Sequence, residues 1–321
     1  MSKKTGSAAI NEALAECMRK DPNVFVFGED LIHALFGVTR GLVNEFGPER
    51  IFNTPLSESA LMAAAVGASI QGMRPVLEIQ FADILSISFD HIVNSAAKMH
   101  YLSDGMVKCP LVVRAPMGYG ISLGMHHSQC VESWFANVPG LIIVAPSTPG
   151  DAKGLLTASV DNDNPVIFLE HKKLYYLKGE VPEGYYQIPL GKGFIHREGK
   201  DITIVSYSFA LQTALQAAEV LAQQGIEAEV VDPRTIRPLD VDIILQSVRK
   251  TGRLAIVHEA PAFGGFGGEI AAVVAEHAFS SLKGPIIRVC GKECPVPFGM
   301  ETVVVPKTED VVTAVKKLMA K

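Results

Sequence analysis

Cysteine is scarce in this 321-residue chain, and its spacing excludes the common uses of the residue. The chain has five cysteines, at positions 17, 109, 130, 290 and 294. Their number is odd, and no two of them form a CxxC motif. Cys290 and Cys294 have no second pair of ligands nearby, which argues against a zinc site. We therefore expect reduced thiols and a cytoplasmic protein.

Long hydrophobic runs and an excess of positive charge are missing as well. The longest apolar stretches, such as residues 61–70, fall far short of the roughly 20 residues that a membrane span needs. The start, MSKKTGSAAINEAL, has no apolar core, so we do not expect a secretory signal. The formal net charge is −5, which gives no reason to expect nucleic acid or an anionic membrane as a partner.

The chain also has no GxGxxG motif after a predicted strand. This absence argues against a single-chain nicotinamide dehydrogenase. The glycine cluster GGFGGE at 264–269 does not meet that spacing. We interpret it as a tight turn from strand to helix with close backbone packing, in preference to a nucleotide site.

Short apolar runs alternate with longer amphipathic segments along the chain. Runs at 23–28, 74–80, 109–116, 141–146 and 165–170 are typical of buried strands, and 89–102 is typical of a helix. Repeated strand–helix–strand units predict the α/β class, with a parallel sheet covered by helices. The pattern breaks in a segment rich in Gly, Pro and Tyr and then resumes. We predict two parallel-sheet-containing domains, at 1–178 and 193–321, joined by a linker at 179–192.

Two adjacent histidines follow the glycine-rich stretch GYGISLG, just after the predicted strand at 109–116. Open α/β sheets place their binding sites in loops at the carboxyl ends of parallel strands. An imidazole in such a loop can transfer protons near neutral pH. His126 and His127 are therefore candidate site residues, with a surface or packing role as the alternative.

Glu58 lies where the turn NTPLS meets a very apolar helix. In one interpretation Ser57 or Thr54 caps this helix, and Glu58 complements the helix dipole for a few tenths of a kcal/mol. In the other, Glu58 is a catalytic carboxylate. The residues alone favour the first interpretation and leave the second open.

Seven ordered blocks of the sequence resemble the β subunit of thiamine-diphosphate-dependent 2-oxo acid dehydrogenases. They are NTPLSE, EIQFAD, NSAAKMHYL, HHSQC, DNDNPVIFLEHKKLY, DPRTIRPLD and HEAPAFGGFGGEIAA, and they span nearly the whole chain. The resemblance implies a pyrimidine-binding domain followed by a transketolase C-terminal-type domain, which matches the two predicted α/β halves.

The resemblance assigns chemistry to two residues. The glutamate of the family's SE turn corresponds to Glu58 and hydrogen-bonds a ring nitrogen of the cofactor's aminopyrimidine. That contact promotes the imino tautomer, which activates the thiazolium carbon. The histidine of the HSQ block corresponds to His127, not His126, and is expected to face the thiazolium end and assist proton transfer or hold the substrate.

Four further positions are implied for the pyrimidine pocket. Leu56 and Gln80 fall where the family lines the pocket, and Glu29 is expected in the carboxylate network beneath it. Ile84 falls where many members carry an aromatic residue. This departure removes an aromatic contact worth roughly 0.5–1.5 kcal/mol.

Several family members also bind a structural potassium ion in the first domain. The matching positions are Leu111, Ser159, Asn162 and Asn164, mostly through backbone carbonyls, which suit hard cations. The family often has Asp where this chain has Asn162.

One family motif is missing. Cofactor-binding chains of the superfamily hold the diphosphate and its Mg²⁺ with a GDG…N motif, and this chain contains no GDG. The resemblance therefore implies an α subunit that holds diphosphate and Mg²⁺, in an α2β2 heterotetramer with β–β contacts, docked on a lipoyl acyltransferase core. Pyruvate is the expected substrate. The alternatives are acetoin, a branched-chain 2-oxo acid, or a non-catalytic assembly subunit.

Overall fold

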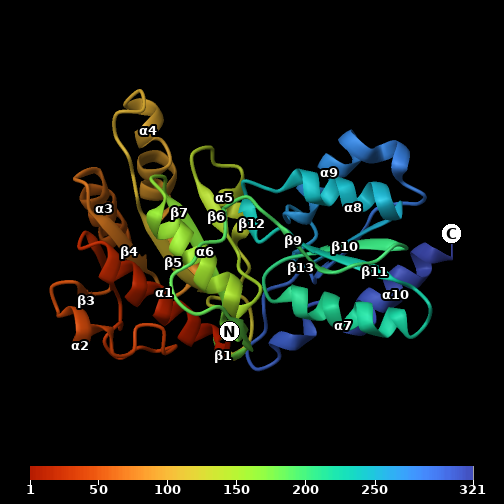
Figure 1. The fold of residues 1–321 in the computed structure, drawn as a ribbon, viewed down its shortest axis with the longest axis horizontal. Helices are drawn as coiled ribbons and strands as arrows, with labels where there is room; N and C mark the ends of the chain where they lie inside the picture. The colour runs from red at the N-terminus through yellow and green to blue at the C-terminus, as the bar shows by residue number, and fades with distance from the viewer. Residues whose placement is uncertain (321) are drawn as a thin grey trace.

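Two helix-flanked sheets form the two halves of the molecule (Figure 1). The structure is a computed structural model and describes residues 1–320. The seven strands of the first sheet are, in spatial order, β12 (Thr235–Arg237), β6 (Ile142–Val144), β7 (Val166–His171), β5 (Val112–Met117), β4 (Arg74–Glu78), β2 (Val24–Gly28) and β3 (Ile51–Asn53). All neighbours are parallel except β12 and β6.

The helices of the first half cover its sheet, apart from α4 (Met99–Leu102), which lies on a projecting arm (Figure 1). They are α1 (Gly6–Lys20), α2 (Leu42–Phe46), α3 (Glu58–Ile70), α4, α5 (Glu132–Ala136) and α6 (Pro149–Asp161), with 3-10 segments at Ala82–Ser88 and Lys172–Tyr176 and a π-helix at His91–Ala96. All residues of β5 and β7 are buried. Burial on both faces is what a helix-covered parallel sheet requires, and it explains the continuous apolar runs of the sequence.

The second half contains a five-stranded sheet. Its order is β14 (Ile287–Gly291), β13 (Leu254–Pro261), β10 (Ile202–Ser206), β11 (Ala228–Asp232) and β9 (Phe194–Arg197), parallel except for β9. Helices α7 (Ala210–Ala222), α8 (Val241–Thr251), α9 (Gly267–Ala278) and α10 (Thr308–Met319) accompany it, with 3-10 turns at Phe279–Ser281 and Glu301–Val303. The α/β prediction is confirmed. The antiparallel edge strands β9 and β12 were not predicted.

The two halves are tied together by more than a linker. Strand β12 comes from the second half but adds to the edge of the first sheet by pairing with β6. Ile236 of β12 belongs to a buried apolar cluster that also holds Ile143 and Ile244. Strand β8 (Lys178–Val181), which runs into the predicted linker at 179–192, pairs with β1 (Ser2–Thr5). Farther along the linker, Tyr186 donates to the carbonyl of Gly150 at 2.6 Å. Part of the predicted linker is therefore ordered along α6.

The glycine cluster at 264–269 forms the turn between β13 and α9. A Cβ on Gly265 would lie 2.3 Å from the carbonyl oxygen of Pro261, and one on Gly267 would lie 2.6 Å from Nε2 of His258. The close-packing interpretation is thus confirmed. All five cysteines are free thiols. Across residues 1–320, no helix is both long and apolar enough to traverse a bilayer.

Candidate active site

Four neighbouring parallel strands carry the predicted site residues at their carboxyl ends. Glu29 follows β2, Glu58 follows β3, Gln80 follows β4, and His127 lies in the loop after β5. Because these strands are adjacent and parallel in the order β5-β4-β2-β3, the residues that follow them lie at the same end of the sheet. Ligands of open α/β sheets bind at that end.

Glu58 is the first residue of α3, and its side chain is partly buried. Ser57 occupies the N-cap position, but its side chain makes no capping hydrogen bond within the described chain. The Thr54 hydroxyl is buried and also has no partner among residues 1–320. Neither candidate cap closes the helix, so the capping interpretation loses its main support. The turn before α3 leaves the Glu58 carboxylate beside Glu29 instead.

Glu29 is a buried carboxyl without a hydrogen-bond partner. It is 3% exposed. Its oxygens make no hydrogen bond of good geometry within residues 1–320, and the Ser57 backbone amide beside them opposes only part of the rise in its pKa. Burial, and then the charge of Glu58, raise the pKa of Glu29 to about 7. Native proteins rarely leave such a group unpaired, and perturbed carboxyls cluster at functional sites.

The raised pKa gives Glu29 a measurable effect on stability. Between about pH 4.5 and pH 7 the folded state holds a proton on Glu29 that the unfolded state has released. The free energy of unfolding therefore falls as pH rises through this window. We expect the melting temperature of Glu29→Gln minus that of wild type to increase from pH 5 to pH 7.5. Glu49→Gln is the control for charge loss alone, because Glu49 is exposed and is not among the charges that raise the pKa of Glu29. Parallel wild-type and Glu29→Gln curves would refute the raised pKa of Glu29.

The other predicted pocket positions differ in burial and in their contacts near the carboxylate pair. The Gln80 amide donates to Glu78 at 2.9 Å and lies 3.5 Å from the carbonyl oxygen of Glu29. Ile84 is partly buried and packs against the core from the 3-10 segment. Leu56 is 76% exposed, so this chain leaves an apolar side chain open at the mouth of the site.

A buried ionic network supports Gln80 from beneath. Arg114 makes two hydrogen bonds to Glu170, both 2.7 Å, and a third to Glu78 at 2.5 Å. Tyr175 donates to Glu170 at 2.6 Å. A buried pair of this kind is costly to break from one side, because the remaining charge is left unpaired. The network fixes Glu78 and, through it, the amide of Gln80.

His127 lies in a loop that leaves β5 and returns at Gln129. The loop is closed by a hydrogen bond from the Gly118 amide to the Gln129 carbonyl, at 3.1 Å. The His127 ring is partly buried and packs edge-on against Phe81, with ring centroids 4.8 Å apart. His126 is exposed. This difference agrees with the choice of His127 over its neighbour.

Two residues at this site were missed in the sequence analysis. Phe81 follows Gln80 directly and joins the Glu29 side of the site to His127. It lies inside the block EIQFAD, so its position was visible although its contact was not. Lys172 is fully buried and donates to the carbonyl of His127, and it lies 3.3 Å from the Ser128 hydroxyl. No sequence pattern indicated that Lys172 would be fully buried.

Comparison with known proteins places this arrangement in a family. The chain matches the transketolase pyrimidine-binding domain over residues 2–178 and the transketolase C-terminal domain over residues 191–311. It is 45% identical to the β subunit of acetoin:2,6-dichlorophenolindophenol oxidoreductase of Cupriavidus necator, covering 97% of this chain and 96% of that one. It is 48% identical to the β subunit of 2-oxoisovalerate dehydrogenase of Bacillus subtilis, over 89% of each.

A third relative is the β subunit of the pyruvate dehydrogenase E1 component of Rickettsia felis, 45% identical over 97% of this chain and 96% of that one. The chain belongs to the β subunits of the thiamine-diphosphate-dependent 2-oxo acid dehydrogenases. This confirms the resemblance carried by the seven sequence blocks. A split-gene transketolase, described as an inactive β4 tetramer, superimposes with a TM-score of 0.79 at 25% identity over 98% of both chains. Leishmania mexicana transketolase shares the fold, with a TM-score of 0.73 at 16% identity; the match covers all of this chain and 46% of that one.

The site of this β subunit fits the pyrimidine end of thiamine diphosphate. An aminopyrimidine presents ring nitrogens and an amino group, which need acidic and amide partners. The unpaired Glu29 carboxyl, the adjacent Glu58 and the fixed Gln80 amide supply them. The exposed Leu56 offers an apolar contact for a ring.

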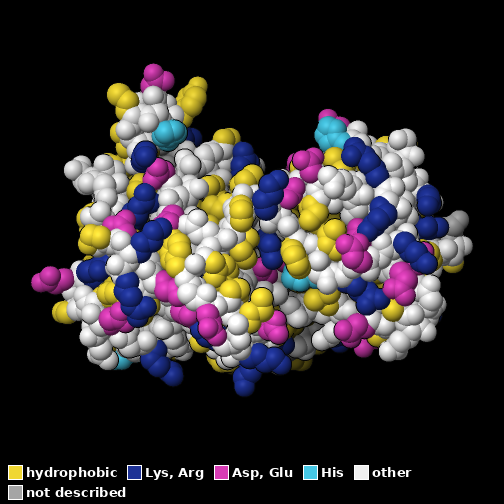
Figure 2. All heavy atoms as spheres, in the orientation of Figure 1, with side chains coloured by type: hydrophobic (Ala, Val, Ile, Leu, Met, Phe, Trp, Pro, Cys, Tyr) yellow, Lys and Arg dark blue, Asp and Glu magenta, His cyan; other side chains and the backbone are white. Residues whose placement is uncertain are grey.

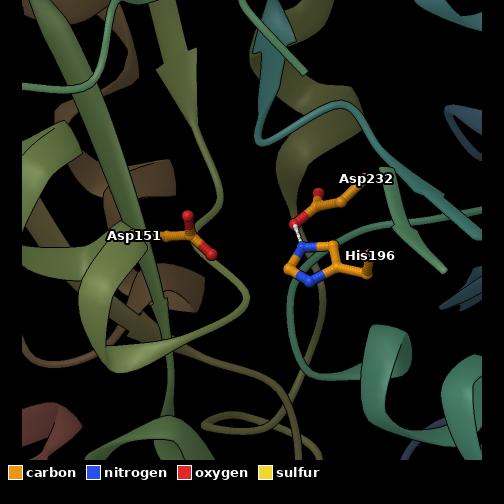
Figure 3. Close-up of side chains that lie close together, drawn as sticks. All are labelled: Asp151, His196 and Asp232. Atoms are coloured by element: carbon orange, nitrogen blue, oxygen red, sulfur yellow. Dashed lines mark ion pairs between the residues drawn. The ribbon is translucent and has the colours of Figure 1, made fainter. Parts of the chain in front are cut away.

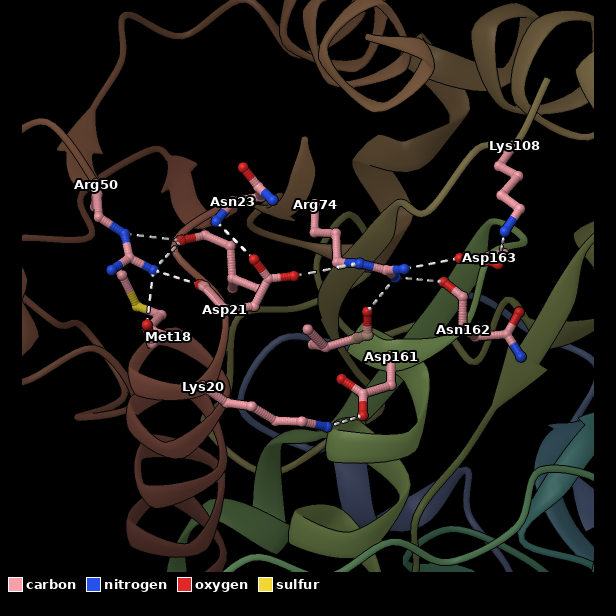
Figure 4. A network of polar contacts seen from close by, with 12 residues as sticks. Met18, Lys20, Asp21, Asn23, Arg50, Arg74, Lys108, Asp161, Asn162 and Asp163 are labelled. Carbon is pink, nitrogen blue, oxygen red and sulfur yellow. Dashed lines mark hydrogen bonds and ion pairs between the residues drawn. The ribbon is translucent and has the colours of Figure 1, made fainter. Parts of the chain in front are cut away.

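One position predicted for potassium, Asn162, lies beside the Arg74 guanidinium in this β subunit (Figure 4). Arg74 donates to the carbonyls of Val160, at 2.9 Å, and Asn162, at 3.1 Å, and pairs with Asp163 at 2.7 Å. The remaining predicted ligands are also hydrogen-bonded: the carbonyls of Leu111 and Ser159 accept from backbone amides, and the Asn164 amide donates to the Asn162 side chain. The potassium site stays a prediction.

A second acidic cluster lies between the two halves (Figure 3). Asp151 of α6 faces His196 of β9 and Asp232 of β11, with one ligand-type atom of each within 4.8 Å of the others. Arg234 pairs with Asp151 at 2.7 Å, and Thr148 donates to the same carboxylate at 2.5 Å. Arg234 therefore already pairs with one of the two carboxylates, and we interpret the cluster as an interdomain contact.

Proposed function

We propose that this β subunit forms the pyrimidine and thiazolium side of an active site that decarboxylates pyruvate oxidatively and transfers the acyl group to a lipoyl carrier. The observation that supports the proposal is the Glu29–Glu58 pair at the carboxyl edge of the sheet, joined through Gln80 and Phe81 to His127. Retention of Glu58 and His127 argues against a non-catalytic assembly subunit.

Each residue has a distinct task in this proposal. Thiamine diphosphate, when bound, supplies a carbon nucleophile and an electron sink for decarboxylation. Glu58 holds a proton at a pyrimidine ring nitrogen, and Glu29 keeps a second proton close to neutral pH beside it. Gln80 orients the ring through its fixed amide. His127, held against Phe81, moves a proton or binds the substrate at the thiazolium end.

Acetoin and branched-chain 2-oxo acids are the alternative substrates, because β subunits named for acetoin and 2-oxoisovalerate enzymes are as similar to this chain as one named for pyruvate. The test is to co-express the chain with an α-like partner and to compare kcat/KM for pyruvate, branched-chain 2-oxo acids and acetoin with an artificial electron acceptor. The highest kcat/KM is expected for pyruvate. A preference for either alternative would overturn that choice of substrate.

The missing GDG motif supports a shared site. In this proposal the α subunit holds the diphosphate and Mg²⁺, and the two chains form an α2β2 heterotetramer on a lipoyl acyltransferase core in the cytoplasm. Hydrophobic side chains gather at the tip of the arm that carries α4 (Figure 2). They include the exposed Tyr101, Leu102 and Met106, which supports β–β contact there. Potassium binding near Asn162 is a further part of the proposal.

A shared site predicts weak cofactor binding by the isolated chain. With no diphosphate motif, the folded β subunit alone is expected to show no saturable heat with thiamine diphosphate and Mg²⁺ in the micromolar range. The α–β complex should bind under the same conditions, and isothermal titration calorimetry on both samples measures the difference. Micromolar affinity in the purified chain alone would rule out the shared diphosphate site.

A further inference from the structure

A carboxylate from the second domain is buried against the loop that carries His127. Glu301 opens the short 3-10 turn Glu301–Val303 and is 4% exposed. One of its oxygens accepts from the backbone amides of Gly120 at 2.7 Å and Ser122 at 3.1 Å. The other accepts from the Leu123 and Gly124 amides, at 3.0 and 3.4 Å.

The Ser128 hydroxyl donates to the same carboxylate at 2.7 Å. Burial by itself would raise the pKa of Glu301, but the Gly120 and Ser128 donors, with further loop amides, outweigh it and lower the pKa below its ordinary value. The carboxylate is therefore ionised at neutral pH. Successive amides that converge on one anion form a nest, and here the anion is part of the protein.

The loop needs such an anchor because its own backbone is unusually free. Gly118, Gly120, Ser122 and Gly124 all have positive φ, between 57° and 137°. Glycines in this region have the largest choice of conformations, so order must come from contacts outside the loop. The loop's last residue, Gln129, is fixed separately by hydrogen bonds to Asp83 at 2.8 and 3.2 Å.

The anchored stretch is coupled directly to His127. The His127 amide donates to the carbonyl of Gly124, at 3.2 Å, and Gly124 is itself held by Glu301. On the other side, the buried Lys172 donates to the His127 carbonyl. Burial lowers the pKa of Lys172, and the negative charge of Glu301 opposes this effect. Glu301 thus acts on both contacts of the His127 backbone: it holds Gly124, which accepts from the His127 amide, and its charge acts on Lys172, which donates to the His127 carbonyl.

We propose that Glu301 is a positioning residue that sets the place of His127 from the opposite domain. It touches neither cofactor nor substrate in this account, and it acts by ordering residues 120–128. The inference rests on the function proposed for His127. It goes beyond that function by making the catalytic loop of the first domain dependent on the second domain.

The test compares Glu301→Gln, His127→Ala and the double variant in the assembled α–β complex. A displaced loop is expected to lower kcat by about 10–100-fold in Glu301→Gln, with little change in the KM for thiamine diphosphate. Because the two residues act in series, Glu301→Gln should cause almost no further loss in the His127→Ala background. Glu301→Asp, which keeps the charge, should recover part of the rate. Glu293→Gln is the matched control, since Glu293 is exposed nearby.

Amide hydrogen exchange in the same complexes separates this inference from the proposed function. Peptides covering residues 119–125 should exchange at least about tenfold faster in Glu301→Gln than in wild type or Glu293→Gln. Unchanged exchange, or fully additive losses of turnover, would overturn the positioning role. Faster exchange together with normal turnover of His127→Ala would instead refute the function proposed for His127 and leave the anchoring by Glu301 in place.

Discussion

Replacing Glu58 with glutamine is expected to lower the turnover of the assembled enzyme by about 10²–10⁴-fold, the usual contribution of a positioned proton-transfer group. Glutamine keeps the size of the side chain and can still hydrogen-bond the ring. It cannot hold the proton that the pyrimidine nitrogen requires. Saturating thiamine diphosphate should not restore the rate. The measurement is steady-state decarboxylation by the reconstituted α–β complex.

The competing interpretation of Glu58 makes a different prediction. A helix-terminal charge alone is worth at most about 1 kcal/mol of stability, with activity nearly intact. A melting curve of Glu58→Gln therefore accompanies the kinetic assay. Glu49→Gln is the matched control, because Glu49 is an exposed glutamate in the turn before β3. Turnover of Glu58→Gln within a few-fold of this control would return Glu58 to a structural role.

His127→Ala is expected to give the second large loss, at least about 100-fold in turnover or acyl transfer. Removal of the ring takes away the imidazole beside Phe81 and leaves the carboxylate pair untouched, so cofactor affinity should change little. Steady-state kinetics with a lipoyl acceptor, together with cofactor titration of the complex, measures both effects.

His126→Ala is the internal control for that prediction. The two histidines are adjacent, but His126 is exposed and His127 is partly buried. Loss of His126 should cost less than about tenfold in turnover. If His126→Ala is the more damaging change in folded protein, the assignment within the pair is reversed.

The fold was predictable because the buried strands are locally encoded. Strand β5, for example, is largely apolar, with Arg114 as its one charged residue, and a glycine-rich loop follows it; both features are visible in the sequence. Order along the chain then places His127 after such a strand, and general rules for α/β sheets place that loop at the binding edge. Edge strand β12 was not predictable, since its three residues pair with β6 across a separation of about ninety positions.

The site divides in the same way. The blocks NTPLSE and HHSQC single out Glu58 and His127 through the family resemblance, whereas the residues alone favour a capping role for Glu58. The roles of these two residues stay predictions. Lys172 and Glu301 were not predictable, because their contacts with the histidine loop join distant segments. The raised pKa of Glu29 was not predictable either. The sequence GED gives no sign that burial and the charge of Glu58 raise the pKa of this carboxyl to about 7.

In the proposed function, Glu58 drives activation of thiamine diphosphate held between this chain and its α partner. The most direct test of this role is the rate of hydrogen–deuterium exchange at the thiazolium C2 of the bound cofactor, followed by acid quench and NMR in the α–β complex. We predict that exchange in Glu58→Gln is slower than in wild type and in Glu49→Gln by about 10²–10⁴-fold. An exchange rate in Glu58→Gln within a few-fold of wild type would contradict the account.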